Sequence, residues 1–202
     1  MYKMISPYMV ILETERLILR RQVIEDLDAL WVLYCDPEIT RYIPDAPKSF
    51  EEAREELEWH MNGHPKYPEL GLWATIHKES GRFIGRCGLL PWTIDGREEV
   101  EVAYTIAREF WGHGLGTEAA RAIVTHGFEH LHFTRLICLI EPDNRQSVNV
   151  AQKIGMTFEK AIDHELGILH LYSQSRPRER SYFWPRFPLQ ANGLSAVSDS
   201  NS

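Results

Sequence analysis

Short stretches of alternating apolar and polar residues recur along this chain, and such alternation is typical of half-buried β-strands. The first stretch, Glu13–Arg21, sets Leu17 and Leu19 between charged or polar neighbours. Arg135–Ile140 is instead a nearly continuous apolar run, which favours a strand covered on both faces. The strands predicted in this way are Glu13–Arg21, Leu70–His77, Arg82–Leu90, Arg97–Ile106, Arg135–Ile140, Thr157–Ile162 and Ile168–Ser173.

Apolar residues at helical spacing predict helices between these strands. Ser49 and Glu52 form a capping-box pattern at the start of one helix. The stretch Asp36–Lys48 contains several prolines and is predicted to be a loop. The predicted helices are Glu25–Cys35, Ser49–Met61, Gly116–His130 and Ser147–Ile154.

The order of these elements is β-α-α-β-β-β-α-β-α-β-β, which indicates an α/β (α+β) fold rather than a doubly wound one. Only the two strands that flank the helix Gly116–His130 need to be parallel. We therefore predict a mixed, mostly antiparallel sheet of six to seven strands, with helices on both faces.

A glycine-rich turn joins the strand Arg97–Ile106 to the helix that follows it. Gly112, Gly114 and Gly116 let backbone N–H groups converge at the helix start, where they lack intrahelical partners and the helix dipole adds positive charge. Such a turn suits a phosphate or pyrophosphate. The glycines alone fit a turn without a ligand equally well.

The segment Gly114–Ala119 also fits the dinucleotide fingerprint G-x-G-x-x-G/A. Two observations count against that reading. The polar turn Ala107–His113 separates the segment from the strand, and too little chain follows for the remaining βαβ units. A P-loop is excluded because no Gly-Lys-Ser/Thr follows the glycines.

The 202 residues fit one domain, and their net charge of −7 argues against nucleic acid as the main ligand. The three scattered cysteines predict a reducing compartment. No apolar run near the N-terminus predicts a signal peptide or a membrane span, so we expect a cytoplasmic protein. After Arg176 the composition changes to arginines, prolines and aromatic residues, which predicts a domain at 13–176 and a C-terminal extension at 177–202, disordered in its last part.

Several motifs together resemble the GNAT family of acyl-CoA-dependent N-acetyltransferases, over roughly Thr14 to Ser175. The stretch Trp111–Gly116 is similar to the family's pyrophosphate motif Arg/Gln-x-x-Gly-x-Gly/Ala, with Trp111 in place of Arg/Gln. Phe-Trp-Gly-x-Gly in this position resembles the branch that contains the ribosomal-protein N-terminal acetyltransferases RimJ and RimL. Other stretches that look like this branch are Thr14-Glu-Arg-Leu-x-Leu-Arg20, Glu101-Val-Ala-Tyr104, and Asn144-x-x-Ser147 before Lys153-Ile-Gly-Met156.

The resemblance implies acetyl-CoA as cosubstrate, no metal, and direct attack on the thioester by a primary amine of a protein N-terminus or a small molecule. It implies that backbone groups of Tyr104, Thr105 and Ile106 hold the pantetheine arm, and that Asn144 also contacts the cofactor. The pyrophosphate would be held by N–H groups of His113, Gly114, Leu115, Gly116 and Thr117. The chain is then expected to act as a monomer or homodimer.

An attacking amine must be neutral, so a base or a water chain has to take its proton. By resemblance Glu101 fits the base, although an exposed strand carboxylate is the competing interpretation. The family's usual general acid is a Tyr at the position of Ala151, and Ser147 could replace it. Ser147 could equally be a helix-capping serine.

Two further functions stay open on the sequence. Loss of the usual Tyr is compatible with a non-catalytic acyl-CoA-binding module that acts as a sensor or partner protein. A nicotinamide-dependent oxidoreductase is the weaker alternative. Histidines spaced four apart, at His60/His64 and His126/His130, lack the other features of a metal site, so no metal is predicted.

Overall fold

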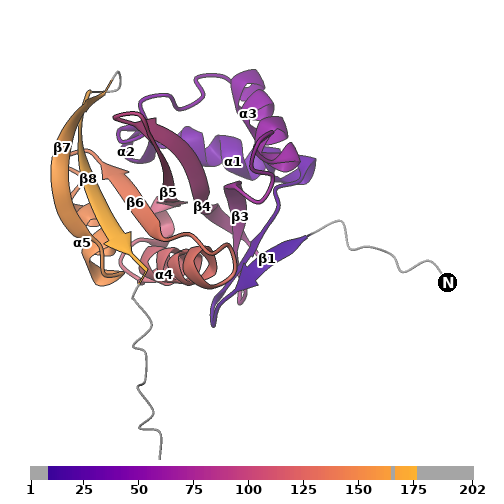
Figure 1. Cartoon of the computed structure of the whole chain (residues 1–202). Coiled ribbons are helices and arrows are strands. Elements are labelled where there is room, and N and C mark those ends of the chain that lie inside the picture. Colours follow the sequence, from indigo (N-terminus) through magenta and orange to yellow (C-terminus); the bar gives the residue numbers. More distant parts are fainter. Residues whose placement is uncertain (1–8, 165–166, 177–202) are drawn as a thin grey trace, which may run out of the picture.

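Eight strands form one sheet in the computed structural model, which describes residues 9–164 and 167–176 (Figure 1). The strand order is β1-β2-β3-β4-β5-β6-β8-β7, and all neighbours are antiparallel except β5 and β6. The strands are β1 (Val10–Glu13), β2 (Leu17–Arg20), β3 (Gly71–His77), β4 (Phe83–Ile94), β5 (Arg97–Ile106), β6 (Arg135–Ile140), β7 (Thr157–His164) and β8 (Gly167–Ser175).

The predicted fold class is confirmed, and the predicted parallel pair is the observed one, but the sheet has eight strands instead of six to seven. The stretch Glu13–Arg21 was expected to be one strand. The chain instead reverses after Glu13. At this reversal the Thr14 hydroxyl accepts the Leu17 N–H, and the Thr14 N–H donates to the Leu17 carbonyl. The residues Val10–Glu13 therefore fold back onto β2 as an additional edge strand. The predicted extension at 177–202 lies outside the described residues.

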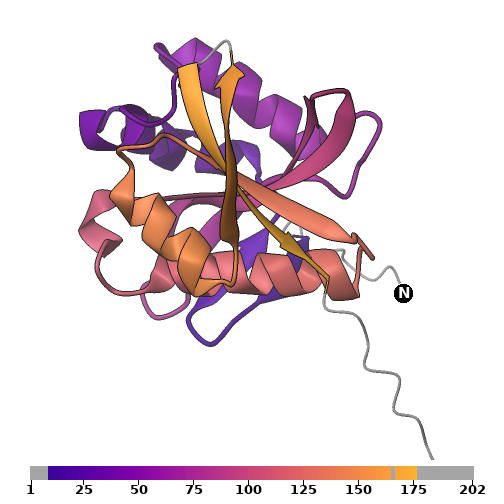
Figure 2. The same ribbon diagram turned by 60° about the vertical axis from the view of Figure 1, so that its left-hand side comes forward.

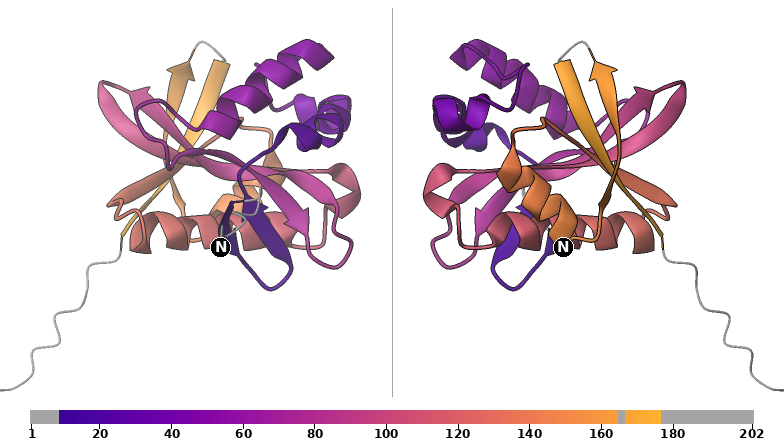
Figure 3. Two further views of the ribbon diagram at one scale, coloured as in Figure 1. Left: turned by 90° about the vertical axis from the view of Figure 1, so that its right-hand side faces the viewer. Right: turned by 90° about the vertical axis from the view of Figure 1, so that its left-hand side faces the viewer.

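Helices cover both faces of the sheet, as predicted (Figure 3). On one face lie α1 (Leu27–Tyr34), α2 (Pro37–Thr40) and α3 (Phe50–Asn62), and on the other lie α4 (Leu115–Glu129) and α5 (Arg145–Lys153), which are adjacent in Figure 2. The α2 turn falls in a predicted loop, where the Asp36 carboxylate accepts the Glu38 N–H and caps it. Short 3-10 turns occur at Ile24–Asp26 and Arg108–Phe110. None of the described helices is long and apolar enough to cross a membrane.

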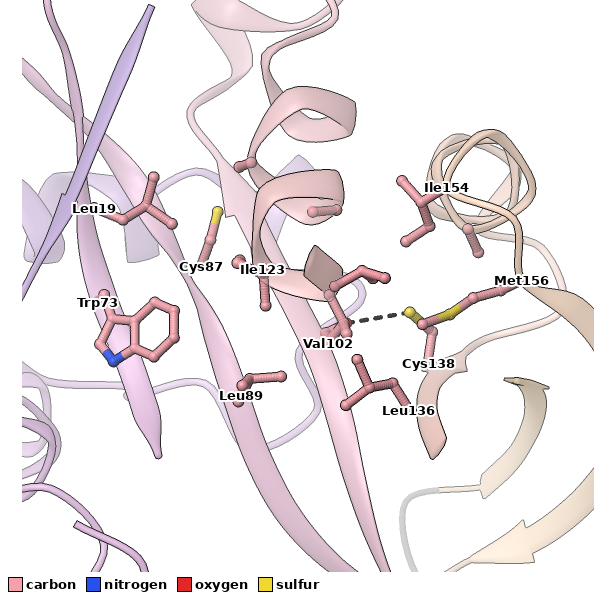
Figure 4. Close-up of a cluster of buried hydrophobic side chains, with 14 of the residues drawn as sticks. Leu19, Trp73, Cys87, Leu89, Val102, Ile123, Leu136, Cys138, Ile154 and Met156 are labelled. Atoms are coloured by element: carbon pink, nitrogen blue, oxygen red, sulfur yellow. Dashed lines mark hydrogen bonds between the residues drawn. The ribbon is translucent and has the colours of Figure 1, made fainter. Parts of the chain in front are cut away.

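The main core lies between the sheet and the helices α4 and α5 (Figure 4). Alternation along β5 sends Val102 and Ile106 into this core. Glu101, Ala103 and Thr105 consequently point to the opposite face, toward α1 and α3. This division places the polar residues of β5 away from the packed side chains of α4.

The sheet splits between β5 and β6. Their pairing is limited to Glu101 opposite Ile137, whereas β6 pairs with β8 along its whole length. Beyond Glu101, side chains connect the two strands in place of the main-chain ladder. The Cys138 thiol donates to the Val102 carbonyl at 3.2 Å, the dashed bond in Figure 4. The two strands thus diverge toward their carboxyl ends, which is where ligands bind in open α/β sheets.

Candidate active site

A cavity of about 590 Å³ occupies the gap between the diverging strands. Six of the predicted site residues line it, namely Glu101, Tyr104, Thr105, Ile106, Asn144 and Ser147. Its wall on the α1–α3 side includes Tyr42, Asp45 and Trp59. The cavity therefore joins the two faces of the sheet, and residues far apart in sequence meet in it.

Glu101 lines this cavity and is only 9% exposed, so it is not a surface carboxylate. Its Oε2 accepts the indole N–H of Trp92 at 2.7 Å, and its Oε1 accepts the backbone N–H of Leu139 at 3.3 Å. Burial raises the pKa of Glu101 to about 7, the charge of Asp45 adds to this rise, and the two hydrogen bonds oppose it. Glu101 can therefore gain or lose a proton near neutral pH.

The raised pKa predicts a specific loss of stability with rising pH. The folded protein binds the Glu101 proton more tightly than the unfolded chain, so stability falls as pH rises from the usual pKa of 4.5 to about 7. At about 1.4 kcal/mol per pKa unit, the loss is about 3 kcal/mol. The Glu101→Gln protein should not show this loss of stability with rising pH. Urea unfolding of both proteins at pH 4.5 and pH 8 checks this, and a constant difference between them would contradict it.

Tyr104 and Asn144 hold the start of α5 in place. The Tyr104 hydroxyl donates to the Ser147 carbonyl at 2.9 Å, and burial raises the pKa of Tyr104 well above its usual 10. The Asn144 side chain accepts the Ser147 N–H at 3.1 Å and caps the helix. The side chain that caps α5 is therefore that of Asn144, not that of Ser147. Ser147 lines the cavity, and its hydroxyl does not cap the helix.

The glycine turn forms the start of α4, beside the carboxyl end of β5. Gly114 is the N-cap with φ of 79°, and the helix ladder begins with the N–H of Glu118 on the Gly114 carbonyl. Among the described residues nothing accepts the N–H groups of Leu115, Gly116 and Thr117. The turn residues do not line the cavity itself. Free N–H groups at a helix start fit the pyrophosphate of acetyl-CoA.

Two residues beside the glycine turn were not among the predicted site residues. Arg16 donates to the His113 carbonyl at 3.0 Å and pairs with Glu118 at 2.6 Å, which joins the β1–β2 turn to the first turn of α4. Trp111 donates its indole N–H to the Ile106 carbonyl at 2.6 Å. That bond uses one of the two lone pairs of the Ile106 carbonyl and leaves the Ile106 N–H unused, so Tyr104, Thr105 and Ile106 all stay backbone candidates for the pantetheine arm.

A partly buried ion pair lines the cavity on the side of α1 and α3. Arg86 on β4 bonds to Glu56 on α3 at 2.5 Å, and Glu56 also accepts the hydroxyl of Tyr34 on α1. His60 accepts the Leu72 N–H, and burial together with the charges of Arg86 and Arg21 lowers its pKa to about 3. This arrangement attaches both helices to the sheet. Within the described part of the chain, no three potential metal ligands come together.

Comparison with known proteins identifies the family. The model of the acetyltransferase (GNAT) domain matches residues 16–157. The chain belongs to this family. It is 36% identical to the uncharacterized protein YkkB of Bacillus subtilis over 75% of this chain and 87% of that protein. It is 30% identical to the uncharacterized N-acetyltransferase p20 of Bacillus licheniformis over 83% of this chain and 89% of that protein.

A solved structure supports the same fold. The ribosomal-protein-S5-alanine acetyltransferase from Vibrio fischeri superposes with a TM-score of 0.69 at 17% identity, over 83% of this chain and 97% of that one. The resemblance to the RimJ/RimL-like branch is thereby confirmed for the fold. The protein is an acetyltransferase whose cosubstrate is acetyl-CoA, and the nicotinamide alternative is wrong.

Proposed function

We propose that this GNAT protein acetylates a primary amine by direct attack within a ternary complex, with Glu101 as the general base. The observation that carries the proposal is the burial of Glu101 in the cavity between β5 and β6, with a pKa of about 7. A carboxylate with this pKa is still partly ionised at neutral pH, so it can accept a proton. Its raised pKa also makes it a much stronger base than an exposed carboxylate. We assign the activity to residues 13–176.

Starting from an ammonium ion, the reaction removes two protons from the nitrogen and delivers one to sulfur. Acetyl-CoA supplies an acyl group already activated as a thioester, so no covalent nucleophile is required. Glu101 takes a proton from the ammonium form, and the nitrogen lone pair then forms the new C–N bond while the C–S bond breaks. Ser147 donates a proton to the departing sulfur and is recharged from the amide nitrogen through water. The products are an N-acetyl amine and CoA.

The cofactor side of the site is formed by α4, β5 and α5. The N–H groups of His113, Gly114, Leu115, Gly116 and Thr117 would hold the pyrophosphate, and backbone groups of Tyr104, Thr105 and Ile106 would hold the pantetheine arm. Asn144 would contact the cofactor at the start of α5. Arg16, which bonds to the His113 carbonyl, would add positive charge beside the phosphates.

The acceptor side faces α1–α3, and its charge favours a cationic amine. Asp45 has no ion-pair partner among the described residues, while the Glu56 charge is matched by Arg86. The rings of Tyr42 and Trp59 line the same wall. Both a protein N-terminus and a small amine satisfy these features, and an assay with both kinds of acceptor distinguishes them.

The deciding experiment has two parts. Acetyl-CoA should raise the melting temperature of the purified protein, and NAD(P) should not. Thiol release should then be measured with a panel of small amines and of peptides with free N-termini. Release with an acceptor supports the proposal. Stabilisation by acetyl-CoA without release for any amine would favour the non-catalytic module instead.

Replacing Ser147 by Ala should lower turnover by about tenfold or more and leave stability nearly unchanged. The proton donor is lost, whereas the helix cap survives because it uses the Ser147 backbone N–H and the Asn144 side chain. Steady-state kinetics and thermal melts check both parts. Asn144→Ala is the matched variant, and it should cost about 1 kcal/mol of stability. Normal turnover in Ser147→Ala would remove Ser147 from the mechanism.

A further inference from the structure

The indole of Trp92 holds one oxygen of the Glu101 carboxylate. Leu90 is the direct cross-strand partner of Glu101, and Trp92 is opposite Glu99, so Trp92 reaches Glu101 as a diagonal neighbour on one face. The bond from Nε1 to Oε2 is 2.7 Å, short for a nitrogen donor and typical of a charged acceptor.

Packing fixes the direction of this indole N–H. The Trp92 side chain packs against the buried cluster of Ile94, Ile137 and Leu171, and the His164 ring lies edge-on to it at 5.5 Å between centroids. Contacts with residues of other strands therefore restrict its rotamer. A side chain held in this way can orient another one at little entropic cost.

The two oxygens of Glu101 differ as a result. Oε2 has the 2.7 Å bond to Trp92, while Oε1 has only the 3.3 Å bond to the Leu139 N–H, across the gap that the diverging strands leave. The stronger bond withdraws more electron density from its oxygen. Oε1 is thus the more basic oxygen, and it is the one directed toward β6.

We propose that Trp92 is a positioning residue for this reaction: it fixes the Glu101 carboxylate so that Oε1 takes the proton from the acceptor amine. The N–H electron pair stays on nitrogen and becomes the nucleophilic lone pair. This inference rests on the proposed role of Glu101 as base. It goes further in assigning the orientation and basicity of that base to a residue on the neighbouring strand.

Asp45 raises the pKa of Glu101, and other titratable or charged groups line the same cavity or lie against Trp92. None of them is removed when Trp92 is changed. They come from the loop before α3, from β4 and α3, from β5, from β6 and the residue after it, and from β7. These groups are Asp45, the Arg86–Glu56 ion pair, His60, Tyr104, Cys138, Glu141 and His164. A comparison at constant background therefore isolates the indole hydrogen bond.

The test is the pH dependence of kcat/KM for the acceptor in Trp92→Phe. Loss of the hydrogen bond to the carboxylate should move the acidic limb to higher pH by about one unit, a loss of about tenfold at pH 6. At pH 9 the loss should be much smaller, because Glu101 is ionised in both proteins. Trp31→Phe is the matched control, since Trp31 on α1 packs edge-on against Phe50 and does not line this cavity, and its limb should stay in place.

A direct titration separates this inference from the proposed function. The Glu101 carboxyl is followed by ¹³C NMR in unliganded protein, with and without the Trp92 substitution. A Glu101 pKa and an acidic limb that both rise in Trp92→Phe support the positioning role. A pKa that rises while the limb stays in place means that Glu101 is not the base, so the proposed function fails and this inference fails with it. An unchanged Glu101 pKa and an unchanged limb would overturn the inference. If Trp92→Phe does not fold, benzothienylalanine at position 92 keeps the ring and replaces only the N–H.

Discussion

Glu101→Gln should lower turnover by about 10²–10⁴-fold near pH 7 and leave the affinity for acetyl-CoA nearly unchanged. Gln has the size of Glu, and its carbonyl oxygen can still accept the Leu139 N–H, so the connection between β5 and β6 persists. The change removes the basicity and, because the Gln amide has a single acceptor oxygen, it also leaves the Trp92 indole N–H without its acceptor. The free N–H groups at the start of α4, which would hold the pyrophosphate, are untouched by the change.

The pH profile gives this prediction its sharpest form. The wild-type acidic limb should fall near pH 7, the pKa of Glu101. Glu101→Gln should lose that limb and recover part of its activity at high pH, where the amine deprotonates unaided. Glu98→Gln is the matched control, because Glu98 lies on the same strand but is exposed and paired with Lys66. If Glu101→Gln keeps the wild-type turnover at every pH, the proton of the acceptor amine is taken by water and not by Glu101.

The sequence predicted most of the fold because β5 and β6 have simple patterns. Val102, Tyr104 and Ile106 alternate with smaller or polar residues, and Arg135–Ile140 is apolar throughout. The glycines between these strands predicted a turn followed by a helix. A helical crossover of this kind joins two parallel strands, so β5 and β6 were predicted to be parallel. The extra strand β1 was missed because a side chain, that of Thr14, forms the reversal, and periodicity carries no signal for it.

The site was harder to predict because it depends on register. The positions of Glu101 and Tyr104 followed from strand alternation and from the resemblance to the GNAT family. Neither showed that Glu101 would be buried, because the divergence of β5 and β6 is a tertiary feature. The bond from Trp92 depends on the exact register of β4 against β5, which the turn Asp95-Gly96 sets. The capping residue of α5 depends in the same way on where the helix begins. The helix begins at Arg145, so the residue before it, Asn144, is the cap and Ser147 lies inside the first turn.

Gly114→Val should weaken acetyl-CoA binding by about tenfold or more. Gly114 has φ of 79°, a conformation that a β-branched residue avoids, so the turn should relax and its N–H groups should no longer converge. A hydrogen bond to a charged group contributes about 1.5–3 kcal/mol, so loss of one such bond to a phosphate accounts for the expected factor. Isothermal titration calorimetry measures this directly.

The matched control for Gly114→Val is Gly81→Val. Gly81 has φ of 66° in the turn between β3 and β4, and an added Cβ would meet nothing within 4 Å, while at Gly114 the nearest atom is Arg16 Nη2 at 3.7 Å. Both substitutions should therefore cost similar stability, about 1–2 kcal/mol, through backbone strain. Only the change at Gly114 should alter acetyl-CoA affinity, since only that turn begins a helix with free N–H groups. Equal, wild-type affinities in the two folded variants would mean that the pyrophosphate binds elsewhere.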